Sequence, residues 1–147
     1  MEMSDSAAHA ICFCQGTFSE IGVDIPKTIR HFGDRIRYVH FRDVVGTTPR
    51  FRKSFHGNGK TDMLTAMLAY REIGYQGPMR PDHVPVLEGE EAWADFQAEA
   101  VPEEEITVDT FNASEGPVSA GYTMLGRLFA VGYMKGLIEA TQPPARC

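Results

Sequence analysis

In this 147-residue sequence, the residues best suited to catalysis or binding lie in the stretch GPMRPDHVP, residues 77–85. An acid and an imidazole, Asp82 and His83, stand side by side between two prolines, and Arg80 precedes them. Proline fixes its own φ and also restricts the residue before it. The backbone is therefore stiff on both sides of these groups, which is typical of either a charged turn or a built site.

Potential metal ligands stand at the ends of three predicted strands. Apolar and β-branched runs predict strands over residues 8–14 and 35–44, and a third over 77–82. Side chains alternate along a strand, which places Cys14 on one face with Cys12, and His40 on one face with Ile36. Sites of parallel α/β folds lie at the carboxyl ends of the strands. We therefore expect Cys14, His40 and Asp82 at one rim.

A thiol, an imidazole and a carboxylate are ligands of a divalent ion of borderline softness, such as Mn²⁺, Fe²⁺ or Zn²⁺. Each residue alone has a plainer interpretation. Cys14 could be a small buried apolar residue. His40 could be a strand histidine with ordinary hydrogen bonds, and Asp82 could cap a turn. Their shared place at strand ends is the feature that favours a metal site.

The elements that must position these residues alternate between strand and helix. Helix-start and helix-stop residues predict helices over 23–33 and 61–74, and an apolar run predicts a long one over 121–140. Glycines and a proline predict a loop over residues 45–60. This alternation indicates parallel βαβ units and an α/β fold. A complete (β/α)₈ barrel needs about 250 residues, so the chain is either a small open sheet or part of a larger barrel.

Charge and composition exclude several classes of protein. The net charge is −6, which argues against a nucleic-acid partner, and no apolar run reaches the length of about 18 residues that predicts a membrane span. Residues 1–10 show no secretory signal. Three sparse cysteines, Cys12, Cys14 and Cys147, indicate a reducing compartment, so we expect a cytoplasmic protein.

An acidic block interrupts the second half of the chain. Eleven of the 20 acids lie between Pro81 and Gly126, where there is no lysine or arginine. Such a block is usually solvated. We expect residues 88–119 to be an acidic insertion on the surface.

Five motifs together resemble the C-terminal part of the D-mannonate dehydratase family, UxuA. They are FCQGT, DRIRYVHFRDV, FHGNGKTDM, GPMRPDH and GYTMLGRLFAVGYMKGLIEA, in the family's order. The resemblance covers most of residues 10–140 except the insertion. It implies that residues 1–147 form a single C-terminal segment of a (β/α)₈ TIM barrel. It also implies a lyase that dehydrates D-mannonate to 2-keto-3-deoxy-D-gluconate in glucuronate breakdown, with Mn²⁺ or Fe²⁺.

The resemblance also implies a role for each candidate residue. Metal ligands are Cys14, His40 and Asp82; proton-transfer residues are His83 and Tyr122; substrate-binding residues are Arg80 and His56. From spacing alone, His56 is an exposed loop histidine. Dehydration removes a proton α to a carboxylate and expels a β-hydroxyl, so it requires an acid, a base and stabilisation of the developing charge.

The sequence departs from the family in two ways. The family is much longer, and a strand that supplies a further metal histidine is absent. His83 and Tyr122 are also separated by the acidic insertion. We therefore expect a homo-oligomer or a partner that supplies the missing barrel strands. Two alternatives stay open: a non-catalytic fragment or subunit, and another metal-dependent sugar isomerase of the xylose-isomerase-like barrel type.

Overall fold

The computed structural model describes residue 6 and residues 8–90 and 123–142 of the chain. The expectations for Tyr122, Cys147 and most of the acidic block lie outside the described residues. The described elements, in chain order, are β1 (Ile11–Cys14), α1 (Gln15–Ile21), α2 (Ile25–Phe32), β2 (Ile36–Phe41), β3 (Asp43–Thr47), β4 (Arg50–Ser54), α3 (Met63–Glu72), β5 (Met79–Pro81) and α5 (Met124–Ala140).

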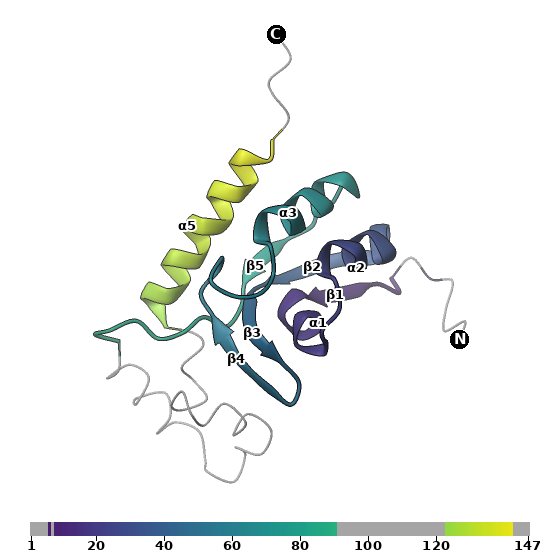
Figure 1. Ribbon diagram of the computed structural model, residues 1–147. Helices are drawn as coiled ribbons and strands as arrows, with labels where there is room; N and C mark the ends of the chain where they lie inside the picture. Colours follow the sequence, from purple (N-terminus) through teal and green to yellow (C-terminus); the bar gives the residue numbers. More distant parts are fainter. Residues whose placement is uncertain (1–5, 7, 91–122, 143–147) are drawn as a thin grey trace.

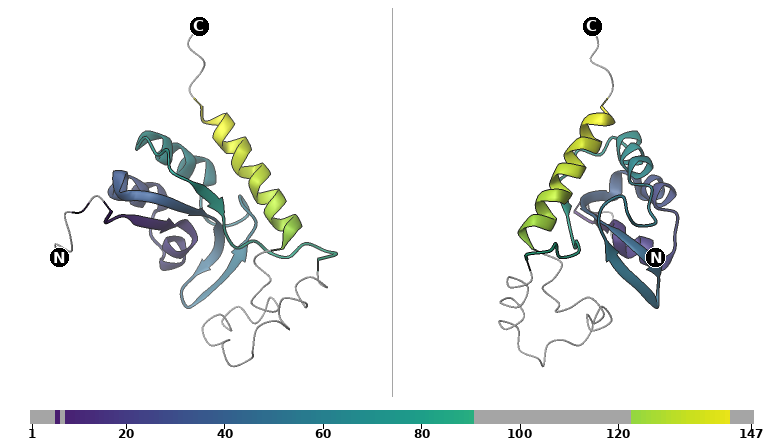
Figure 2. Two further views of the ribbon diagram at one scale, coloured as in Figure 1. Left: turned by 180° about the vertical axis from the view of Figure 1, so that it is seen from behind. Right: turned by 60° about the vertical axis from the view of Figure 1, so that its left-hand side comes forward.

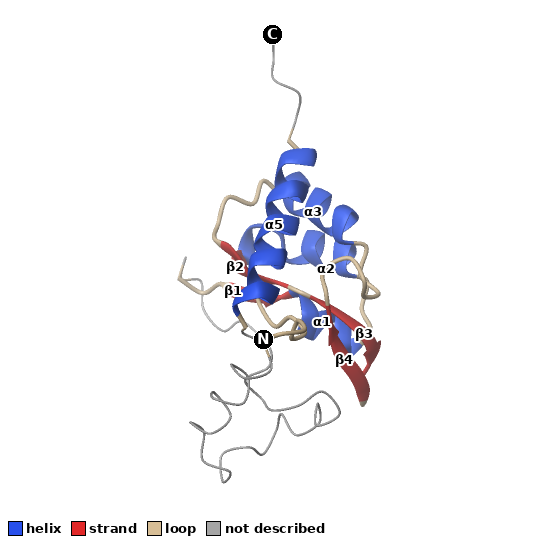
Figure 3. Ribbon diagram, turned by 90° about the vertical axis from the view of Figure 1, so that its left-hand side faces the viewer, coloured by secondary structure: helices blue, strands red, loops and turns tan. Residues whose placement is uncertain are grey.

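A three-stranded parallel sheet in the order β1-β2-β5 forms the centre of the fold (Figure 1). Helices α2, α3 and α5 lie together on one side of it (Figure 3). Phe13, Val39 and Phe41 point to that side and are buried with Ile29 and Met67. The opposite face carries the more accessible Cys12 and His40. The predicted α/β character is therefore confirmed.

Capping explains where the helices begin. The carboxylate of Asp24 accepts a hydrogen bond of 3.0 Å from the amide of Lys27, and that of Asp62 accepts one of 2.9 Å from the amide of Thr65. Each bond satisfies a backbone donor that has no partner inside its helix. The predicted helices over 23–33 and 61–74 are confirmed with shorter bounds, and the one over 121–140 is confirmed from Met124 to Ala140, with residues 121 and 122 outside the described residues.

The expected loop over residues 45–60 was wrong in its first part, where β3 and β4 form an antiparallel hairpin. The predicted strand over 35–44 is correspondingly split at Arg42. Asp43 explains the break, because its buried carboxylate accepts hydrogen bonds from the amides of Gly59 and Thr61 at 2.9 and 3.2 Å. The chain folds around this carboxylate instead of continuing β2. The hairpin projects beyond the sheet in both views of Figure 2.

Two further local expectations were wrong. The register between β1 and β2 shifts after the pair Ile11 and Ile36, so that Cys12 pairs with Tyr38. Ile36 is consequently buried in the core rather than on the face of His40. In addition, the chain turns directly from Cys14 into the short helix α1, which the sequence reading did not include.

The described residues on either side of the acidic segment are in contact. The Glu90 carboxylate accepts a hydrogen bond of 2.6 Å from the amide of Leu125 in the first turn of α5. Residues 90 and 125 are therefore neighbours, although 91–124 separate them in the chain. Among the described residues, no helix has the length and apolar character needed to cross a membrane.

Candidate metal centre

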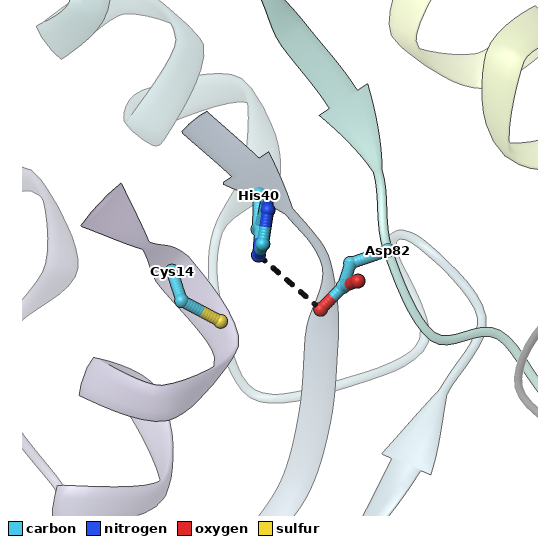
Figure 4. A group of neighbouring side chains, drawn as sticks. All are labelled: Cys14, His40 and Asp82. Carbon is cyan, nitrogen blue, oxygen red and sulfur yellow. Dashed lines mark ion pairs between the residues drawn. The ribbon is translucent and has the colours of Figure 1, made fainter. Parts of the chain in front are cut away.

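Strand pairing brings the three predicted ligands together. Cys14 at the end of β1 pairs with His40 in β2, and His40 pairs with Arg80 in β5, two residues before Asp82. Each of the three offers one ligand atom, and these atoms all lie within 4.8 Å of one another. Figure 4 shows Cys14 and Asp82 on either side of His40. The expectation that the three side chains share one rim is therefore confirmed.

The Asp82 carboxylate is the most enclosed of the three, with 4% of the residue exposed. Arg80 donates a hydrogen bond of 2.9 Å to Oδ1, and Nε of Arg42 lies 3.4 Å from Oδ2. Burial acts to raise the pKa of Asp82, but the Arg80 hydrogen bond and the nearby charges of His83, His40 and Arg42 outweigh it and lower that pKa. Asp82 is therefore held as an anion, the form that a metal ligand needs.

His40 has two different neighbours at its two ring nitrogens. Nδ1 lies 3.7 Å from Oδ2 of Asp82, whereas Nε2 lies 3.8 Å from Sγ of Cys12. The ring of Tyr38 packs edge-on against the imidazole with the centroids 5.4 Å apart. Nδ1 is thus the nitrogen that faces the Asp82 carboxylate.

Cys14 is held at the turn into α1. The hydroxyl of Thr17 donates a hydrogen bond of 3.1 Å to its sulfur. Cys14 and Cys12 are both free cysteines. One thiol, one imidazole and one buried carboxylate converge here, and this donor set fits a divalent ion of borderline softness.

Arg42 and Glu20 form a buried ion pair next to the three candidate ligands, and sequence reasoning gave this pair no role. Nη2 of Arg42 lies 2.7 Å from Oε1 of Glu20. Burial acts to lower the pKa of Arg42, but the charges of Cys14 and Glu20 outweigh it and raise that pKa. The signal available in the sequence was Gly16, next but one to Cys14, because a side chain there would overlap Arg42.

The other predicted site residues take separate positions. The expectation that His56 is exposed was wrong: it is 1% exposed, and its Nε2 lies 2.7 Å from the carbonyl oxygen of Phe41. Burial lowers the pKa of His56, although the Phe41 carbonyl and Asp43 act in the opposite direction, so the ring is held neutral. The Arg80 side chain is 43% exposed. His83 is half-buried beside Asp82.

Comparison with known proteins gives the family. Residues 1–99, about two thirds of the chain, match the family model for D-mannonate dehydratase, UxuA. The chain belongs to the D-mannonate dehydratase family. The resemblance drawn from the motifs is thereby confirmed.

Relatives of this family extend well beyond the chain. Mannonate dehydratase 2 of Halalkalibacterium halodurans is 38% identical over 96 residues, which are 61% of this chain and 28% of that protein. The mannonate dehydratase of Enterococcus faecalis is 33% identical over 147 residues, which cover 97% of this chain and 34% of that protein. The chain thus spans about a third of the length of these family members.

A solved structure supports the fold of this family member. The crystal structure of mannonate dehydratase from Streptococcus suis serotype 2 superimposes with a TM-score of 0.68 at 22% identity. The match covers 94% of this chain and 34% of that one. The α/β arrangement described above is therefore shared with about a third of that solved chain.

Proposed function

We propose that this chain supplies the metal-binding and proton-transfer part of a mannonate dehydratase active site. The reaction is dehydration of D-mannonate to 2-keto-3-deoxy-D-gluconate in glucuronate catabolism, and the ion is Mn²⁺ or Fe²⁺. The observation that carries the proposal is the convergence of Cys14, His40 and Asp82, whose ligand atoms lie within 4.8 Å of one another. The free thiols of Cys12 and Cys14 support a reducing, cytoplasmic location.

The proposed architecture is the C-terminal segment of a (β/α)₈ barrel, comprising residues 1–147 with the acidic insertion inside it. The parallel strands β1 and β5 are both edges of the sheet, and helices cover one face. In a complete barrel the opposite face, with His40, would line the interior. Unpaired edges invite pairing with other strands, so we propose a homo-oligomer or a partner that completes the barrel.

The residues of the chain have distinct proposed roles in the reaction. A bound divalent ion supplies Lewis-acid stabilisation of the charge that develops next to the substrate carboxylate. His83, adjacent to the ligand Asp82, and Tyr122 transfer the protons. Arg80 holds Asp82 with Nη2, and its exposed part is accessible to the carboxylate of the sugar acid. The substrate-binding role of His56 stays a prediction from the family, since here the side chain is buried.

Metal binding by the chain itself is the first test. Calorimetric titration with Mn²⁺ should show binding that is weakened by Cys14→Ser and by Asp82→Ala, while the exposed His31 serves as a control in His31→Ala. Each of the first two variants removes a ligand atom from the cluster. Unchanged Mn²⁺ affinity in both would refute the assignment of the site.

Catalysis is tested after the missing strands are supplied. The chain is combined with the N-terminal two thirds of a family member, and the loss of D-mannonate is followed. His83→Asn and Tyr122→Phe should each lower kcat by about 10²–10⁴-fold without changing metal content, because a general acid or base contributes about that factor. Turnover at the parent rate in His83→Asn would show that this residue does not transfer a proton.

The second candidate is a subunit without catalytic activity. It predicts metal binding without turnover in the reconstituted assembly. A third reading, a metal-dependent sugar isomerase, predicts turnover of a ketose or aldose instead of D-mannonate, which a substrate panel separates.

A further inference from the structure

We propose that Arg42 is a positioning residue of the metal centre, which sets the orientation of the ligand Asp82 and is itself anchored by Glu20. The inference rests on the metal site proposed above. It assigns a task to a side chain that is outside the ligand set and outside the proposed proton-transfer and substrate-binding residues.

Arg42 is anchored by contacts other than the one to Asp82. The residue is 8% exposed, and its Nη2 lies 2.7 Å from Glu20 in α1. The same guanidinium extends to Thr17, whose hydroxyl oxygen is 3.5 Å from Nη2. A guanidinium is planar and rigid, so anchoring Nη2 also limits where Nε of the same group can point. The free rotation of a surface arginine is absent here.

A second nitrogen of the Arg42 guanidinium, Nε, faces one oxygen of Asp82. Nε lies 3.4 Å from Oδ2, the oxygen that is also 3.7 Å from Nδ1 of His40. Arg80 holds the opposite oxygen, Oδ1, at 2.9 Å. The Arg80 hydrogen bond at one oxygen and the ion pair with Arg42 at the other together restrict the carboxylate, and Oδ2 faces the space between His40 and Cys14 (Figure 4). A ligand atom that is already aimed loses less conformational freedom when an ion binds.

Arg42 also connects the other anionic ligand to the same framework. Thr17, which Nη2 approaches, donates a hydrogen bond of 3.1 Å to the sulfur of Cys14. Thr17 and Glu20 both belong to α1, the helix that begins directly after Cys14. Displacement of Arg42 would therefore disturb two of the three ligands, from β1 and from the end of β5, at once. A positive charge between them also reduces the repulsion of a thiolate and a carboxylate.

The absence of a side chain at Gly16 leaves room for the Arg42 guanidinium. A Cβ on Gly16 would lie 2.5 Å from Cζ and 2.6 Å from Cγ of Arg42. The backbone of α1 thus approaches the guanidinium more closely than any other residue type would allow. The carbonyl of Arg42 also accepts a hydrogen bond of 3.3 Å from the buried Gln15 side chain. Three consecutive positions, Cys14 to Gly16, are arranged around Arg42.

The test compares two arginines of the same chain by their effect on metal affinity. Arg42→Lys keeps the charge but cannot contact Glu20 and Asp82 together. Arg71→Lys is the matched control, since Arg71 joins α3 to α5 through the carbonyl of Ile138 at 3.0 Å. Loss of a residue that orients a metal ligand typically costs about 10–100-fold in metal affinity. Arg42→Lys should weaken Mn²⁺ binding by about this factor, and Arg71→Lys should leave it unchanged.

A second readout separates positioning from stability. With Co²⁺ as the probe, Arg42→Lys should keep the sulfur-to-cobalt absorption of Cys14 but change the ligand-field bands, because the carboxylate ligand is reoriented. Glu20→Gln leaves Arg42 in place while weakening its anchor, and it should weaken Mn²⁺ binding in the same direction. Circular dichroism shows whether Arg42→Lys folds. If it does not fold, Mn²⁺ binding by Glu20→Gln tests the positioning role of Arg42 in its place.

The outcomes distinguish this inference from the proposed function. Parental Mn²⁺ affinity and Co²⁺ spectra in folded Arg42→Lys and Glu20→Gln, with binding lost in Asp82→Ala, would overturn the role of Arg42 alone. A parent chain that binds neither Mn²⁺ nor Co²⁺ would overturn both. Equal weakening by Arg42→Lys and Arg71→Lys would assign the effect to general stability and would also overturn the inference.

Discussion

Gly16→Ala should destabilise the chain, although alanine is the better helix residue. The added Cβ would lie 2.5 Å from Cζ of Arg42, well inside the 3.0 Å that real Cβ atoms keep. Arg42 cannot move aside without separating from Glu20 at 2.7 Å and from Asp82 at 3.4 Å. Overpacking of this kind costs about 1–3 kcal/mol. Relief of the helix penalty of glycine returns about 0.5–1 kcal/mol, so the midpoints of the two ranges give an expected net loss of about 1 kcal/mol in the free energy of unfolding.

Gly132→Ala is the matched control for this substitution. Gly132 lies inside α5, and a Cβ there meets no heavy atom within 4 Å. Only the helix term applies, so this variant should gain about 0.5–1 kcal/mol. Urea unfolding followed by circular dichroism should therefore shift the two midpoints in opposite directions at a constant m-value. Stabilisation of similar size in both variants would show that Arg42 does not occupy the space beside Gly16.

Three other outcomes test separate parts of the structure. Asp62→Ala should lower the free energy of unfolding by about 1 kcal/mol, whereas Asp62→Asn should keep most of the cap. The hydrogen bond from the amide of Thr65 lowers the pKa of Asp62, so this stability is present above the ordinary pKa of 3.8 and is lost as pH falls through the folded-state pKa. Unfolding midpoints measured across acidic pH would show this loss. Burial raises the pKa of Tyr75 to about 12, so the contribution of this shift to stability is complete below pH 10.0 and is lost as pH rises towards 12. Phenolate absorbance in the parent should exceed that of Tyr75→Phe only near pH 12. Glu90→Ala should lower stability by about 1–2 kcal/mol and speed hydrogen exchange at the amide of Leu125, and unchanged exchange would contradict the contact at the start of α5.

Much of the candidate site could be predicted from local sequence, because each ligand stands at the end of a strand. Strand ends of a parallel sheet meet at one edge, so Cys14, His40 and Asp82 were expected together before their distances were known. The helix bounds followed from equally local signals, the caps at Asp24 and Asp62. Such signals are readable because capping and alternation act over a few residues.

Other features depended on contacts between distant segments. The hairpin β3–β4 was missed because its start depends on Asp43, whose partners are the amides of Gly59 and Thr61. The burial of His56 similarly depends on Phe41, fifteen positions earlier. Neither the glycine-rich motif around His56 nor the polar character of the His56 side chain indicates which side of the loop faces inward.

The amino-acid sequence by itself indicated the family, the α/β alternation and the three residues that the structure brings together as candidate metal ligands. These follow from residue type, local periodicity and motif order, all of which are written along the chain. Only the tertiary structure decided that Arg42 and Glu20 lie buried next to the candidate ligands and that Glu90 meets Leu125 across the acidic segment. A buried charge is stable only where folding brings a partner to it. Its position therefore depends on the whole packing of the chain rather than on its neighbours in sequence.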